Sequence, residues 1–177
     1  MKRLRVAATA VVAAALLGGC AHMQGSGPSR QQEVARKGSV VMPFDLMRTT
    51  HFFDDNATGG IETITANDHA DAEQVALIRG HLSKEAGRFG RGDFSDPARI
   101  HGTDMPGMAA LAAAGSRLQV TYREVPGGAS LTFASRDPGV VASVHQWFAA
   151  QRSDHAAHMH MHMQGQMHEQ MHEQMHW

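Results

Sequence analysis

The chain has 177 residues, with 16 Lys and Arg against 17 Asp and Glu, so its formal net charge is −1 with neutral histidine. This near balance argues against nucleic acid as a partner, because nucleic-acid binding requires a pronounced basic surface. A single cysteine excludes an intramolecular disulfide and any metal site built from paired cysteines. The length allows one domain of modest size.

The first 19 residues have the features of a bacterial signal peptide. Three of the first five residues are basic, and an apolar run of 12 residues follows, Val6 to Leu17. Such a run is too short to span a bilayer, which takes about 20 residues. It ends in Leu-Gly-Gly-Cys, which resembles the lipobox of bacterial lipoproteins. We therefore expect residues 1–19 to be removed and Cys20 to be lipidated, giving an outer-membrane lipoprotein of the cell envelope that faces the periplasm.

Composition divides the remaining chain into three parts. Residues 20–39 are polar and rich in Gly, Ser and Gln, which is typical of a flexible, disordered tether. Residues 40–153 carry the apolar periodicity of a globular domain. Residues 154–177 are dominated by histidine and methionine, and we expect them to form a disordered metal-binding tail.

The globular domain begins with a strand–strand–helix pattern. Residues 48–54 and 61–65 flank a Gly-Gly turn, as in a β-hairpin. A helix is expected over residues 70–89, with Asp68 as its N-cap. Apolar residues at helical spacing form its expected buried stripe: Val75, Ile78, Leu82, Ala86 and Phe89.

The same pattern recurs after an irregular segment, residues 90–107, and a short helix, residues 108–114. Residues 117–123 and 130–134 flank a second Gly-Gly turn, and Asp137-Pro138 opens a second long helix, with proline well placed in its first turn. Two ββα units predict an α+β fold, in which a four-stranded antiparallel sheet carries its helices on one face. The order of the strands stays open at this stage.

The tail concentrates two kinds of metal-ligand side chain. Residues 155–177 hold seven of the 13 histidines and six of the 12 methionines in the chain. Alternating imidazole and thioether groups at this density are typical of metal-binding tracts. The expected ligands are His155, His158, Met159, His160, Met161, His162, Met163, Met167, His168, Met171, His172, Met175 and His176.

The ligand types also indicate which metal to expect. Neutral imidazole suits Cu(II), Ni(II) and Zn(II), whereas the soft thioether adds a preference for Cu(I). We therefore expect copper, as Cu(I) or Cu(II), with zinc or nickel as further candidates. The expected partners are the membrane, through the lipid anchor, the metal ion itself, and a metal-transport protein of the envelope.

Histidines outside the tail offer two candidate metal sites in the core. One joins His51 on the first strand, His81 on the first long helix and His101 in the irregular segment. The other is local and combines His101 with Met105 and Met108, a soft set suited to Cu(I). Neither set has a recognised metal-binding spacing. Each histidine could instead cap a helix, bond a backbone carbonyl or face solvent.

Most of the globular domain resembles a family of small secreted proteobacterial proteins. The resemblance lies in residues 42–46 (Met-Pro-Phe-Asp-Leu), 49–51 (Thr-Thr-His), 78–82 (Ile-Arg-Gly-His-Leu) and 92–102 (Gly-Asp-Phe-Ser-Asp-Pro-Ala-Arg-Ile-His-Gly). Members are often labelled aspartate carbamoyltransferase. We interpret that label as a misnaming, because the chain lacks the Ser-x-Arg-Thr-Arg segment that binds carbamoyl phosphate and the two larger domains of those enzymes.

These observations lead to one main functional hypothesis and two alternatives. The main hypothesis is a periplasm-facing lipoprotein that binds copper or a similar metal for buffering, resistance or hand-over. The first alternative is a small extracytoplasmic metal-dependent enzyme or small-molecule binder that uses the core histidines. The second is an envelope interaction module. The sequence gives an enzyme little support, since it has no nucleophile motif and no phosphate loop.

Overall fold

The computed structural model describes residues 28–155. The expected signal peptide, the expected lipidation site Cys20 and the tail ligands from His158 onward lie outside the described residues. Within the described part, no helix is both long and apolar enough to cross a bilayer.

The centre of the molecule is a four-stranded antiparallel sheet in the order β1-β2-β4-β3. The strands are β1 (Thr49–Asn56), β2 (Gly59–Ala66), β3 (Gln119–Val125) and β4 (Gly128–Ala134). Each hairpin belongs to one of the two predicted ββα units. The hairpins join through their second strands, where Ile64 of β2 pairs with Ala129 of β4. The predicted α+β fold is thus confirmed, and the strand order is now known.

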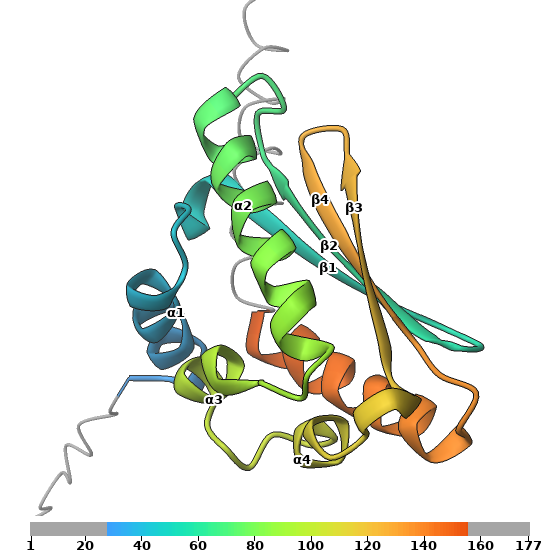
Figure 1. Cartoon of the computed structure of the whole chain (residues 1–177). Helices are drawn as coiled ribbons and strands as arrows, with labels where there is room; N and C mark the ends of the chain where they lie inside the picture. Colours follow the sequence, from blue (N-terminus) through green and yellow to red (C-terminus); the bar gives the residue numbers. More distant parts are fainter. Residues whose placement is uncertain (1–27, 156–177) are drawn as a thin grey trace, which may run out of the picture.

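All the helices lie on one side of this sheet (Figure 1), as predicted. They are α1 (Arg30–Val41), α2 (Ala72–Phe89), α3 (Ser95–His101), α4 (Met108–Ala112) and a helix over residues 138–155. Two short 3-10 turns, η1 (Leu46–Arg48) and η2 (Gly115–Arg117), precede β1 and β3. The α2 helix and the 138–155 helix complete the two ββα units.

Alternation along the strands separates an inner from an outer face of the sheet. On β1, Phe53 is 6% exposed, whereas its neighbour Phe52 is 45% exposed. On β2, Glu62 and Ile64 are buried and Ile61 is exposed. Successive side chains of a strand point to opposite faces of the sheet. His51 and Glu62 therefore lie on the same face as Phe53 and Ile64, toward the helices.

The core between sheet and helices is an aromatic cluster. Trp147 meets Phe133 edge-on, with ring centres 5.4 Å apart, and also contacts Phe89 and Phe94 at 5.9 and 5.5 Å. Phe148 lies against Phe133 at 5.5 Å. These edge-to-face pairs add about 0.5–1.5 kcal/mol each beyond the burial of apolar area. Residues from α2, β4 and the 138–155 helix are thereby locked together.

Helix α2 begins later than expected, because a different aspartate caps it. The Asp71 carboxylate accepts a hydrogen bond from the Gln74 backbone N–H at 3.2 Å, whereas Asp68, the expected cap, accepts one from the Ala70 N–H at 2.8 Å in the preceding turn. Of the expected stripe, Ile78, Leu82 and Phe89 are buried, and Val75 and Ala86 are partly buried. Two polar residues, Gln74 and Glu85, are buried on the same helix.

The expected flexible tether over residues 20–39 is wrong for its second half. Residues 30–39 belong to α1, which starts with a reciprocal capping box between Ser29 and Gln32. Val34 and Gly38 of this helix are buried, and α1 packs on α3. The sequence did not predict this helix because its composition is polar. The helix buries only a narrow stripe and depends on contacts with distant parts of the chain.

Two further boundaries differ from the prediction. Part of the expected irregular segment, residues 90–107, forms helix α3, in which Pro97 and Ile100 are buried. The expected tail boundary at residue 154 falls inside the last helix, which continues through His155. Asp154 is 4% exposed and is therefore part of the domain.

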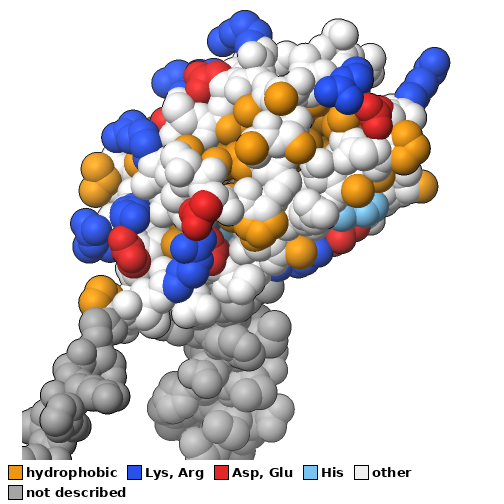
Figure 2. Space-filling view, turned by 90° about the horizontal axis from the view of Figure 1, so that it is seen from below, with side chains coloured by type: hydrophobic (Ala, Val, Ile, Leu, Met, Phe, Trp, Pro, Cys, Tyr) orange, Lys and Arg blue, Asp and Glu red, His pale blue; other side chains and the backbone are white. Residues whose placement is uncertain are grey.

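Charged side chains are mixed over the surface. On the face seen in Figure 2, Lys and Arg side chains are interspersed with Asp and Glu, so that no extended region of one charge covers that face. This distribution agrees with the small net charge of the chain.

A pair of glycine substitutions tests the close packing of the central strands. A Cβ at Gly128 would overlap the Ile64 carbonyl oxygen on the neighbouring strand. We expect Gly128→Ala to lower the free energy of unfolding by about 1–3 kcal/mol or more in chemical denaturation. The control is Gly80→Ala in α2, where no atom lies within 4 Å of the new Cβ. That variant should be more stable than the parent, by about 0.5–1 kcal/mol.

Candidate functional site

A small cavity lies between the inner face of the sheet and the helices. Its volume is about 30 Å³, and one water molecule needs roughly 10–15 Å³ on this measure. It therefore has room for about two waters, or for one ion and a water, but not for an organic substrate. Eight of its lining residues have polar side chains: His51, Glu62, His81, Glu85, Asp96, His101, Gln151 and His155.

The structure brings together the three core histidines that the sequence singled out. His51 reaches the cavity from β1, His81 from α2 and His101 from the end of α3. A fourth, His155, comes from the last helix, although the sequence assigned it to the tail. Each of these histidines lies on a different element, so no short sequence motif could have predicted the cluster.

His101 is held by a hydrogen bond to a buried carboxylate. Its Nδ1 lies 2.8 Å from Asp154 Oδ2, and Arg30 donates to the two oxygens of Asp154 at 2.6 and 2.7 Å. Burial works against ionisation of Asp154, but the hydrogen bonds from Arg30 and His101 lower the pKa of this carboxyl below its usual value. Because an ionised carboxylate only accepts hydrogen bonds, Nδ1 of His101 carries the proton and Nε2 keeps its lone pair.

The imidazole of His101 is neutral in this setting. Burial lowers its pKa below the usual value, and the opposing effect of Asp154 is smaller. A carboxylate that fixes the tautomer of a neutral imidazole is the arrangement commonly found behind histidine ligands of metals.

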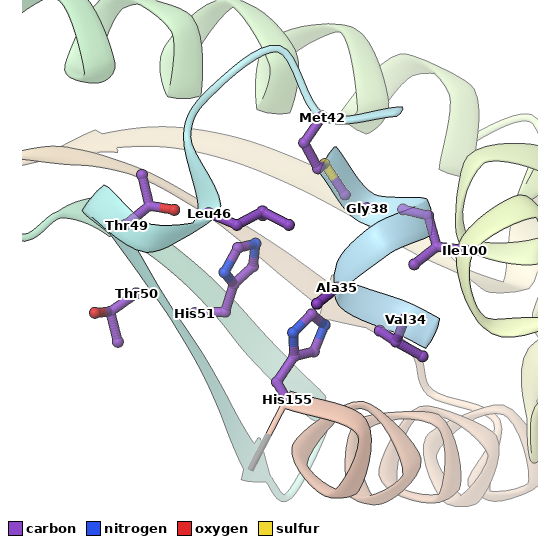
Figure 3. Close-up of a pocket in the computed structure, with 10 residues that line it drawn as sticks. All are labelled: Val34, Ala35, Gly38, Met42, Leu46, Thr49, Thr50, His51, Ile100 and His155. Carbon is purple, nitrogen blue, oxygen red and sulfur yellow. The ribbon is translucent and has the colours of Figure 1, made fainter. Parts of the chain in front are cut away.

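His155 links this pair to His51. Its ring lies nearly parallel to that of His51, with centres 5.1 Å apart, and meets His101 edge-on at 5.3 Å. Both His51 and His155 also line a neighbouring pocket of about 20 Å³ under α1, which is walled by Val34, Ala35 and Gly38 (Figure 3). These two histidines thus stand between the outer pocket and the inner cavity.

His81 is partly buried beside an aromatic ring. Phe44 packs edge-on against it, with ring centres 5.6 Å apart, and the same phenyl ring lies 5.8 Å from His51. Burial lowers the pKa of His81 to about 4. Its imidazole is therefore neutral near pH 7, and neutral imidazole is the form that binds metals.

Two glutamates that the sequence did not select complete the polar lining. Burial and the nearby charge of Glu85 raise the pKa of Glu62 to about 8. Burial also raises the pKa of Glu85, even though Arg88 donates to its Oε1 at 2.9 Å. The spacing of His81 and Glu85, four residues apart on one helix, is a signal that could have found this pair.

Three polar atoms of the lining are buried without a hydrogen-bond partner among residues 28–155: Glu85 Oε2, Gln151 Oε1 and Trp147 Nε1. Each such atom costs roughly 1–3 kcal/mol when nothing satisfies it. A guest in the cavity would remove that cost.

The second candidate set, His101 with Met105 and Met108, is not assembled around this cavity. Both methionines are buried in the apolar core, at 4% and 5% exposure, whereas His101 points to Asp154. His145 has a structural role, since its Nε2 lies 3.0 and 2.9 Å from the carbonyls of Asn56 and Gly59. Within residues 28–155, no three His, Cys, Asp or Glu side chains are already positioned to share one metal ion.

Comparison with protein-family models, curated proteins and solved structures finds no match for this chain. The functional argument therefore depends on the site itself.

The raised pKa of Glu62 gives a testable pH dependence. The native protein keeps a proton on Glu62 up to about pH 8, whereas the unfolded chain releases it near the ordinary glutamate pKa of 4.5. The stability contributed by this proton is fully present below that lower pH and is lost as the pH rises toward 8. Relative to Glu62→Gln, the parent should lose up to about 1.4 kcal/mol of unfolding free energy per pH unit across this window, measured by urea titration.

The matched control is Glu124→Gln on β3, at a side chain that is 58% exposed. A similar pH-dependent gain in that variant, or no gain in Glu62→Gln, would contradict the assignment of the effect to the buried carboxyl.

Proposed function

We propose that this protein is a lipid-anchored protein of the bacterial envelope that binds copper or a similar transition metal. In this proposal the His/Met tail captures the ion, and a cluster of His51, His101 and His155 receives it. The observation that carries the proposal is the position of His155. It is the first histidine of the tail sequence, yet it lies against both His51 and His101 beside the cavity.

The spacing of the three rings suits a shared ion. Two imidazoles on one tetrahedral ion, with metal–nitrogen bonds of about 2.0–2.1 Å, place their ring centres about 5 Å apart. The rings of His51 and His101 lie 5.1 and 5.3 Å from that of His155. Sharing one ion requires the rings to turn until their nitrogens point to it. The hydrogen bond from Nδ1 to Asp154 leaves Nε2 of His101 as the nitrogen suited to bind the ion.

The tail would supply this cluster by proximity. Each imidazole or thioether in the tail binds weakly on its own, but tethering holds the captured ion near the cluster at a high effective concentration. The thioethers favour Cu(I) and the imidazoles favour Cu(II), zinc or nickel. Capture and transfer can therefore use different ligands.

The size of the cavity favours metal binding over an enzyme or small-molecule binder that uses the core histidines. A hydrolase or small-molecule binder acting through His51, His81 and His101 would need room for a substrate next to them. The cavity of about 30 Å³ admits only water-sized guests.

Metal titration of the mature protein tests this proposal. We expect several Cu(II) ions to bind to the full chain and one to remain after removal of residues 156–177. The combined change His51→Ala and His101→Ala should abolish that last ion in isothermal titration calorimetry. Binding of Cu(II) should weaken as the pH falls through about 6.5, where free imidazole is protonated, whereas Cu(I) binding by thioethers should persist.

The control is His69→Ala, at an exposed histidine outside the cluster. The proposal fails if removal of the tail leaves Cu(II) stoichiometry unchanged, or if the double variant binds as many ions as the parent.

A further inference from the structure

The cavity lining includes oxygen and nitrogen donors that the proposed copper cluster does not use. They come from three elements: Glu62 on β2, His81 and Glu85 on α2, and Gln151 on the last helix. We propose that these groups form a separate cation site, in which Glu62, Glu85 and His81 bind a divalent ion such as Mn²⁺ or Zn²⁺. This site goes beyond the function proposed above, since neither the tail nor the His51–His101–His155 cluster takes part in it.

The first argument is the imbalance of charge. Glu62 and Glu85 are 8% and 2% exposed, and burying two carboxyl groups together is costly unless a positive charge accompanies them. The nearest guanidinium, on Arg88, is shared by Glu85, Asp93 and Asp96. Arg99 adds a contact to Asp96 at 3.6 Å, but within residues 28–155 no ion pair involves Glu62. A divalent ion would accompany this carboxylate in place of a proton.

The second argument is the pair of unsatisfied acceptors. Glu85 Oε2 and Gln151 Oε1 are both buried oxygens with no hydrogen-bond partner in the described part of the chain, and both residues line the cavity. A cation satisfies several oxygen acceptors at once. Trp147 Nε1, the unsatisfied donor beside them, suits a water bound to such an ion.

Helix geometry adds the third ligand. His81 and Glu85 are four residues apart on α2, so they lie on the same helix face one turn apart. His81 is neutral near pH 7, since burial holds its pKa at about 4. Imidazole and carboxylate on successive turns can chelate one ion, and Glu62 lines the same cavity from the sheet.

The size of the cavity and the donor types select the ion. A volume of about 30 Å³ fits an ion with one water. The donors are carboxylate, amide oxygen and imidazole, without sulfur, which suits Mn²⁺ and Zn²⁺ and disfavours the Cu(I) expected for thioethers. The ligand groups are not yet gathered within residues 28–155, so binding requires the glutamate and histidine side chains to rotate inward.

Mn²⁺ is the sharpest probe, because it prefers oxygen ligands and has little affinity for the thioethers of the tail. We expect the full mature chain to bind one Mn²⁺ tightly enough to quench its free electron paramagnetic resonance signal and to raise the melting temperature. Glu85→Gln and Glu62→Gln should each weaken this binding at least tenfold, whereas Glu124→Gln on the surface should not. Both glutamine variants keep the side-chain shape and remove a group that can become a carboxylate ligand, so they should fold.

Two further measurements separate this site from the proposed tail function. The change His155→Ala should leave Mn²⁺ binding intact, even though it removes a ligand of the proposed copper cluster. In crystals of the parent protein soaked with Zn²⁺, anomalous scattering should place a peak between Glu62, Glu85 and His81. Ordered waters alone at that position, or Mn²⁺ binding that survives both glutamine variants, would overturn the proposal.

Discussion

The buried carboxylate of Asp154 is the interaction on which the arrangement of the site depends. It sits near the end of the last helix, accepts two hydrogen bonds from Arg30 at the start of α1, and contacts His101 at the end of α3. Arg30 also donates to the His101 carbonyl at 3.0 Å. One ionised group therefore joins three helices from distant parts of the chain. Removing Arg30 or His101 would leave the buried Asp154 carboxylate poorly satisfied, which is why the three helix ends meet at a defined place.

The sheet and its two long helices were predictable because short-range patterns encode them. Alternation and Gly-Gly turns identify the hairpins, and Ile78, Leu82 and Phe89 identify α2 from helical spacing. The order of the strands was not predictable, since a hairpin specifies only its own pairing and not the contact of β2 with β4. Helix α1 was missed for a related reason. Its docking depends on the pairing of Arg30 with a residue 124 positions away, and no local pattern records such a contact.

The candidate site was predictable only in part. Histidine is uncommon enough that the sequence identified His51, His81 and His101 as candidate ligands. The structure places all three around one cavity. Glu62 and Glu85 did not stand out, because glutamates on strands and helices are usually solvated. Only the register of β2 and the rotation of α2 show that both are buried. His155 was assigned to the tail because its neighbours in sequence are tail-like, whereas its neighbours in space belong to the core.

The contact between Arg30 and Asp154 also brings the first and last described helices together at their outer ends. The points where the polypeptide enters and leaves the folded domain are therefore adjacent. Chains with neighbouring ends tolerate a change of connectivity, because a short linker can join the old ends while new ones open in an exposed turn. The Thr103-Asp104 turn between α3 and α4 is such a place, since both residues are exposed, and a rearranged chain opened there would keep every helix and strand. The covalent order of the two ββα units is thus separable from the three-dimensional arrangement that they build.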